Sequence, residues 1–333
     1  MRQRPATIHA LTITLTLLLL GVPAIGLAQT VASVQLTQTS ITGGTSALVT
    51  GTVSLSSATA TGLRVKLSDN ADAVTVPGSV TVRPQAQVSL PFTVTIGPVE
   101  VPSMVTITAE SEDGGPKTAQ LLVLPPVLNA VGLLPTSLTG GTGVLGGTSV
   151  PVTGKVGLNG RAPTGGFAVQ LSSDNPSVAA PGVASITVPA GALASDAFPV
   201  TTFPFAGCAP IAVTISASSG AVTKTTVLTV SPALPSAVGV LPASIKGGST
   251  GMTVRVGLTG PAPTGGIDVQ LTSSNPAVAT VQQQPIHIPA GGLASAEFPV
   301  TTFPVATSTT VIITTSVGVC RAGVQSTQLT VNP

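Results

Sequence analysis

The chain has 333 residues, of which 43% are hydrophobic, only 7% carry a charge, and none is Trp or Tyr. A disordered chain is excluded by this apolar content, because disorder requires low hydrophobicity as well as unusual charge. The length suits about two or three domains, and abundant Gly, Pro, Val, Thr and Ser are typical of strands and turns.

Residues 1–28 predict a secretory leader. Arg2 and Arg4 form a basic start, residues 10–20 form the apolar run "ALTITLTLLLL", and the small residues Gly26 and Ala28 follow it. We expect cleavage after Ala28. An uncleaved membrane anchor is the alternative, but the apolar run is shorter than the roughly 20 residues that a span needs.

Removal of this leader leaves ten basic and ten acidic residues, because two of the twelve basic residues lie within it. A neutral chain lacks the basic footprint of a nucleic-acid-binding protein and the polybasic patch of a membrane-surface protein. We therefore expect no nucleic-acid partner, no membrane insertion after cleavage, and a secreted or cell-surface location in a bacterium, with the periplasm as the alternative.

Internal repeats organise the rest of the chain. Residues 161–204 align without a gap with residues 261–304, and the phrase "FPVTTFP" ends both segments. A more diverged copy precedes them, so the sequence predicts units at 29–125, 126–232 and 233–333. The joints "LPPV" and "SPALP" are short and proline-rich, which predicts semi-rigid spacers.

Within a unit the hydrophobic pattern has a period of two. Residues 222–230 and 310–317 alternate β-branched with small polar residues, and Gly-Gly, Asn-Pro and Pro-Ala-Gly turns separate the runs. Seven or eight short strands per unit predict an all-β fold of three tandem antiparallel β-sandwiches. In "FPVTTFP", Phe198, Val200 and Thr202 should share one strand face, with Pro199 at an edge, a bulge or the strand's start.

These units resemble the tandem Ig-like or fibronectin-III-like repeats of secreted and surface-exposed bacterial proteins. The resemblance rests on the Ser/Thr-x-x-Gly-Gly segment after the first strand, on "SNPAVA" at 274–279 and on "IPAG" at 288–291. It covers nearly all of the chain after the leader. It implies Ig-like sandwiches that serve as stalks, spacers, adhesive modules or appendages to enzymes.

Two acidic clusters in the first unit are candidate calcium ligands. Asp69, Asn70 and Asp72 follow its third predicted strand, and the cluster of Glu110, Glu112 and Asp113 lies in its last hairpin. Carboxylate and amide oxygens could hold Ca²⁺ weakly. Solvated turns are the simpler interpretation, because the two clusters should lie at opposite ends of the sandwich and the other units lack matching acids.

Other motifs lack the context that their chemistry needs. Residues 141–146 fit G-x-G-x-x-G, but a strand-like run rather than a helix follows them. Residues 247–251 fit G-x-S-x-G, but a nucleophile elbow also needs a His/acid pair, and the matching residues 43–46 of the first unit are simply a turn. His287 is the one histidine after the leader and lies in a strand-like segment. We expect no enzyme, no cofactor and no metal cluster.

The loop "FPFAG" is the one Phe-rich loop, so Phe203 and Phe205 are candidate ligand contacts. Glycan-binding sandwiches usually present exposed aromatic faces. Seven Phe residues without any Trp or Tyr argue against such a site. A ligand- or glycan-binding module that uses loops at the ends of the units therefore stays the alternative function.

The two cysteines predict a disulfide between units, because exported proteins favour disulfides and each unit holds at most one cysteine. Cys208 should lie in a loop at the C-terminal end of unit two, and Cys320 in the last hairpin of unit three, at its N-terminal end. A short joint would bring these loops face to face, and free thiols are the alternative. The leading hypothesis is a structural or adhesive rod, spacer or assembly subunit, with itself or other cell-surface components as partners.

Overall fold

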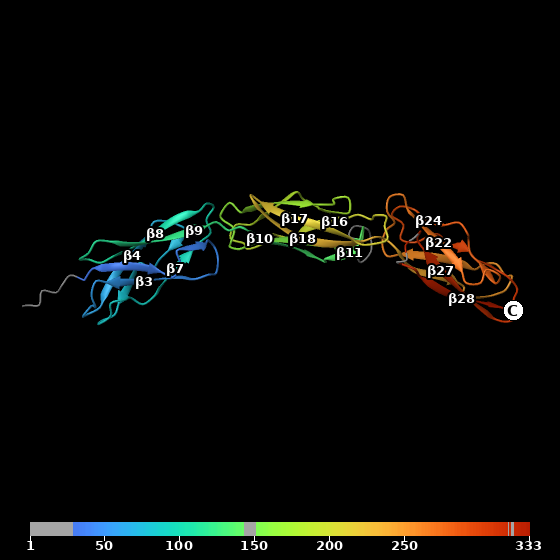
Figure 1. Ribbon diagram of the computed structural model, residues 1–333, viewed down its shortest axis with the longest axis horizontal. Coiled ribbons are helices and arrows are strands. Elements are labelled where there is room, and N and C mark those ends of the chain that lie inside the picture. The colour runs from blue at the N-terminus through green and yellow to red at the C-terminus, as the bar shows by residue number, and fades with distance from the viewer. Residues whose placement is uncertain (1–28, 143–150, 319, 321–322) are drawn as a thin grey trace, which may run out of the picture.

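The computed structural model describes residues 29–142, 151–318, 320 and 323–333, and all the regular elements in this part of the chain are β-strands. The expected leader lies outside the described residues, as does most of the G-x-G-x-x-G run. Figure 1 shows three groups of strands that follow one another along the long axis. The described residues contain no helix that is long and apolar enough to cross a membrane.

The first group, sandwich 1, contains nine strands. They are β1 (Val31–Leu36), β2 (Ser40–Thr42), β3 (Val49–Leu55), β4 (Leu63–Asp69), β5 (Val74–Thr75), β6 (Ser79–Val82), β7 (Phe92–Ile96), β8 (Ser103–Glu110) and β9 (Lys117–Leu124). Inward and outward residues alternate, as in β3, whose burial pattern changes at every residue. The strands form two facing sheets in the orders β1-β3-β7-β5 and β2-β9-β8-β4-β6.

One strand pair departs from the expected antiparallel arrangement. The first strand is split into β1 and β2, and the chain crosses between them from one sheet to the other. Because β2 continues in the direction of β1, it pairs in parallel with the last strand, β9. The same split occurs in the other two groups, and it raises the number of strands above the seven or eight expected from turn spacing.

Sandwich 2 repeats this plan with nine strands in the sheets β10-β12-β16-β14 and β11-β18-β17-β13-β15. They are β10 (Leu128–Leu134), β11 (Ser137–Thr139), β12 (Val152–Leu158), β13 (Phe167–Ser173), β14 (Ala179–Pro181), β15 (Ser185–Val188), β16 (Phe198–Thr202), β17 (Ile211–Ser219) and β18 (Val222–Ser231).

Sandwich 3 has ten strands, because the counterpart of β16 is interrupted at Val300. They are β19 (Pro235–Leu241), β20 (Ser244–Lys246), β21 (Thr253–Leu258), β22 (Ile267–Ser273), β23 (Ala279–Thr280), β24 (Ile286–Ile288), β25 (Phe298–Pro299), β26 (Thr301–Thr302), β27 (Thr309–Ser316) and β28 (Ser326–Asn332). One face is the sheet β20-β28-β27-β22-β24, and the other consists of β19-β21-β25 and the pair β23-β26.

Buried apolar side chains form three separate clusters, one in each sandwich. Val, Leu and Ile dominate all three, which agrees with a composition rich in β-branched residues. Each core is therefore the layer between two sheets, and it is complete without the neighbouring sandwich.

A buried serine recurs at one position of each core: Ser89, Ser195 and Ser295 are 7%, 4% and 3% exposed. The Ser195 hydroxyl accepts a hydrogen bond from the backbone N–H of Val156 at 3.2 Å and donates to the carbonyl of Asp196 at 2.7 Å. The other two serines make the same pair of bonds. Each hydroxyl thus satisfies an interior N–H that would otherwise lack an acceptor.

The recurring "FPVTTFP" phrase lies on strand β16 as the alternation predicted. Phe198, Val200 and Thr202 are buried and Pro199 is exposed. The ring of Phe198 covers Gly154 so closely that a Cβ on this glycine would overlap the ring. In sandwich 3 the glycine is replaced by Val254, and there Phe298 is only half-buried and the strand is interrupted.

Candidate functional site

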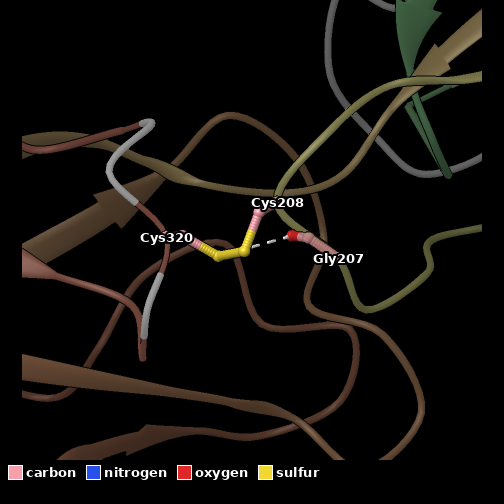
Figure 2. Close-up of a disulfide and its surroundings, with 3 residues drawn as sticks. All are labelled: Gly207, Cys208 and Cys320. Atoms are coloured by element: carbon pink, nitrogen blue, oxygen red, sulfur yellow. Dashed lines mark hydrogen bonds between the residues drawn. A yellow bond between two sulfur atoms is a disulfide. The ribbon is translucent and has the colours of Figure 1, made fainter.

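The junction between sandwiches 2 and 3 contains the disulfide Cys208–Cys320. Cys208 lies in the loop after β16, Cys320 lies in the β27–β28 hairpin, and their Cα atoms are 5.2 Å apart, although 112 positions separate them in sequence. Figure 2 shows the bridge between these two loops, with the carbonyl of Gly207 facing the Cys320 sulfur. A covalent bond between two separate cores restricts how they can move relative to each other.

Besides the disulfide, closely packed glycines bring the two sandwiches into contact at this junction. Gly141 has a positive φ of 78° and is buried against Pro261, whose Cγ would lie 2.8 Å from a Cβ at that position. Gly260 is similarly close to the methyl group of Thr139. The Gly-Gly turn of sandwich 2 and the turn after β21 in sandwich 3 therefore meet with no room for side chains.

The same two turns meet at the junction between sandwiches 1 and 2. Gly44, with a φ of 71°, packs on Arg161, and a Cβ on Gly160 would overlap the carbonyl oxygen of Gly43. The backbone N–H of Arg161 donates to the carbonyl of Gly44 at 3.0 Å. This bond has no equivalent at the second junction, because proline at position 261 has no N–H.

The sequence contained a signal for this junction that was not recognised. Each unit carries the Gly-Gly pair, and units two and three carry a glycine at 160 and 260. The Gly-Gly pair by itself predicts only a turn inside one unit. Gly44 and Gly141 are buried, whereas their counterpart in sandwich 3, Gly248, is exposed. The Gly-Gly turns of sandwiches 1 and 2 are therefore the ones that a following sandwich covers.

Two cavities lie at the second junction, and the candidate ligand contacts Phe203 and Phe205 line different ones. A cavity of about 310 Å³ is lined by Phe203 and Pro204 from sandwich 2 and by Pro261 and Gly291 from sandwich 3. Another of about 280 Å³ is lined by Phe205, Ala206 and Gly207 from the disulfide loop, and by residues of sandwich 3 that include Asp268. The "FPFAG" loop thus contributes one phenylalanine to each cavity.

Two of the candidate calcium ligands, Asp69 and Asn70, face backbone N–H groups. Asn70 Oδ1 accepts a hydrogen bond from the N–H of Thr106 at 2.8 Å, and the carboxylate of Asp69 faces the N–H groups of Ala71 and Val76 at 3.4 and 3.3 Å. The described residues contain no group of three His, Cys, Asp or Glu side chains that could hold a metal ion.

The role of Asn70 recurs in the other sandwiches with different side chains. Asp174 Oδ1 accepts from the N–H of Thr214 at 2.8 Å, and Ser274 Oγ accepts from the N–H of Ile312 at 2.9 Å. A serine, which has a single uncharged oxygen, performs the same task as Asn70 and Asp174. These residues therefore link the strand end to the neighbouring strand, a role that needs no ion.

His287 lies on strand β24 and contacts Asp268 on β22. Its Nδ1 is 2.7 Å from Asp268 Oδ1, and the two side chains are 57% and 66% exposed. An exposed pair of this kind contributes little to stability. Ser249, the serine of the G-x-S-x-G run, lies in the Gly-Gly turn after β20, with no helix behind it in the described chain.

Comparisons with known proteins find matches only among solved structures, at low identity and low TM-score. No family model matches the chain, and no curated protein matches it. Among solved structures, domains A168–A170 of titin are 12% identical over 92% of this chain and 97% of that one, with a TM-score of 0.37. Domains 4 and 5 of the S-layer protein SbsC are 19% identical over 62% of this chain and 98% of that one, with a TM-score of 0.26.

The D0-D1 domain of intimin is 12% identical over 61% of this chain and 96% of that one, with a TM-score of 0.26. Identities and TM-scores this low say nothing about the role of this chain. Its description as three tandem β-sandwiches rests on its own strand order and on its three separate cores.

Proposed function

We propose that the chain is a non-catalytic extracellular protein that acts as a rod, spacer or assembly subunit with a structural or adhesive role. Its units would be 29–125, 126–232 and 233–333, and export with cleavage of residues 1–28 would leave Gln29 as the first residue. Its partners would be copies of itself or other cell-surface components.

The disulfide Cys208–Cys320 is the observation that carries this proposal. A bond between two sandwiches does nothing for the core of either one, since each core is complete alone. Its effect is on the angle between them, which matters for a protein that holds its ends apart. Glycine packing at both junctions acts in the same direction.

Small-angle X-ray scattering of residues 29–333 tests the proposal. An oxidised rod should give an asymmetric pair-distance distribution with a long tail. The double variant Cys208→Ser, Cys320→Ser should broaden this distribution while leaving each sandwich folded, because the link lies outside the cores. A compact particle, or identical curves for both proteins, would contradict a role that depends on fixed extension. The mass of the exported protein identifies its first residue.

A further inference from the structure

Arg161 is an exposed residue at the first junction. Its guanidinium Nη1 donates a hydrogen bond to the carbonyl oxygen of Gly191 at 2.7 Å, while its backbone packs on Gly44. A side chain of sandwich 2 thus lies between its own turn at Gly191 and the Gly-Gly turn of sandwich 1. The guanidinium is a planar donor that matches an exposed carbonyl.

The second junction has the same glycine turns as the first, but a proline takes the place of the arginine. Pro261 stands at the position of Arg161, exactly one repeat later, and the cavity of about 310 Å³ lies against it. Gly141 and Gly291, the counterparts of Gly44 and Gly191, also line this cavity. The counterparts of Arg161 and of its two glycine neighbours therefore line a cavity at the second junction.

The acceptor for a guanidinium is retained at the second junction. Gly291 and Gly191 have nearly equal φ values, 76° and 73°. Their N–H groups donate to the carbonyls of Ala262 and Ala162 at 2.8 and 2.9 Å. The two turns therefore share this φ and this hydrogen bond, and the second junction keeps a glycine carbonyl where the first has the acceptor of Arg161.

The wall contributed by sandwich 2 also suits a cation. Phe203 lines the cavity and is 41% exposed, whereas its counterpart at the first junction is Gly97. An aromatic face attracts guanidinium groups through its quadrupole. The hydroxyl-bearing residues Thr201 and Thr264 complete the polar part of a wall that is otherwise apolar.

We propose that this cavity, named here the Phe203–Gly291 socket, binds a guanidinium group, supplied by an arginine side chain of a partner polypeptide. The guanidinium would donate to the Gly291 carbonyl and stack on Phe203, as Arg161 donates to Gly191. This recognition role is additional to the proposed rod. It requires the second junction to stay closed, because both sandwiches line the socket, but it does not require a stiff first junction.

NMR titration of ¹⁵N-labelled, oxidised residues 29–333 with N-acetyl-L-arginine amide tests the socket. Saturable shifts should appear at the amides of Gly141, Phe203, Thr264 and Gly291, with an affinity in the millimolar range. N-acetyl-L-citrulline amide, which is uncharged and nearly isosteric, should bind roughly fivefold more weakly. Equal binding of the citrulline or norleucine amides, or spermidine binding as tightly as arginine, would overturn the assignment to arginine.

Two substitutions at one position provide a matched pair. Pro261→Arg should place a guanidinium in the socket from within the chain and abolish the shifts. Pro261→Ala should leave the socket open and keep the affinity within about twofold. Binding by Pro261→Arg at the wild-type level would show that the ligand lies elsewhere and would overturn the proposal.

Phe203→Gly, which installs the residue of the first junction, gives a second readout. It should weaken arginine amide binding roughly fivefold and bring it level with citrulline amide, because the cation–π contact is lost. Unchanged discrimination between these two ligands in Phe203→Gly would contradict the proposed stacking. Scattering that shows bending at the first junction alone would contradict the rod and leave these titrations unaffected, because the socket lies at the second junction.

Discussion

At the scale of single residues, a few polar side chains complete the interiors of these sandwiches. The Ser89, Ser195 and Ser295 hydroxyls are buried, and each accepts a hydrogen bond from a strand N–H and donates to the carbonyl of the residue that follows the serine. Removal of one of these hydroxyls leaves the backbone N–H buried without an acceptor, and the free energy of unfolding then falls by the desolvation cost of that N–H.

Ser195→Ala should therefore destabilise sandwich 2 by about 1–3 kcal/mol, through the unpaired N–H of Val156. Amide hydrogen exchange reports on each sandwich separately, and the β17 amides of Val213 and Ile215 should exchange faster. Ser185→Ala on strand β15 is the control, since Ser185 is exposed and should have little effect. Equal exchange rates in both variants would contradict a structural role for the buried hydroxyl.

At the scale of elements, much of the fold could be predicted from the sequence. The repeats, the strand alternation and the positions of Cys208 and Cys320 at facing ends follow from local patterns and chain direction. The parallel pairing of β2 with β9 could not be predicted, because it depends on the chain crossing between sheets within a single run.

Contacts between neighbouring sandwiches could be predicted only in part, because the recurring glycines mark the turns but not which turn of the neighbour they meet. The role of Arg161 depends on which turn of the preceding sandwich lies against it, and nothing within its own repeat records this neighbour. Asn70 was considered as an ion ligand because its type suits calcium. Its bond to the Thr106 N–H emerges only when two distant strands are placed side by side.

Strand β16 is continuous where Phe198 packs on a glycine, and its counterpart in sandwich 3 is interrupted where Phe298 faces a valine. We infer that the ring needs the glycine for the strand to stay continuous. Gly154→Val in sandwich 2 should force the Phe198 ring outward, as Val254 coincides with a half-buried Phe298 in sandwich 3. We expect a loss of about 1–3 kcal/mol from overpacking, and faster amide exchange at Val200. Gly132→Val is the control, because open space surrounds Gly132. An unchanged Val200 amide in Gly154→Val would disprove this link between packing and strand continuity.

At the scale of the whole molecule, the two junctions share a geometry but differ in how they are fastened. The first has the hydrogen bond from Arg161 to Gly44, and the second has a covalent bridge beside a proline that cannot donate. A single backbone hydrogen bond contributes roughly 0.5–1.5 kcal/mol, so thermal motion can open it, whereas a disulfide stays closed under oxidising conditions.

The chain should therefore behave as a stiff pair of sandwiches with a third attached through a looser joint. Residual dipolar couplings measure this directly, because each rigid body has its own alignment tensor. In the oxidised protein, sandwiches 2 and 3 should share one tensor, and sandwich 1 should give smaller averaged couplings. The Cys208→Ser, Cys320→Ser variant should separate the tensors of sandwiches 2 and 3 and leave the first junction as before. A single tensor for all three sandwiches in that variant would show that glycine packing alone fixes both junctions.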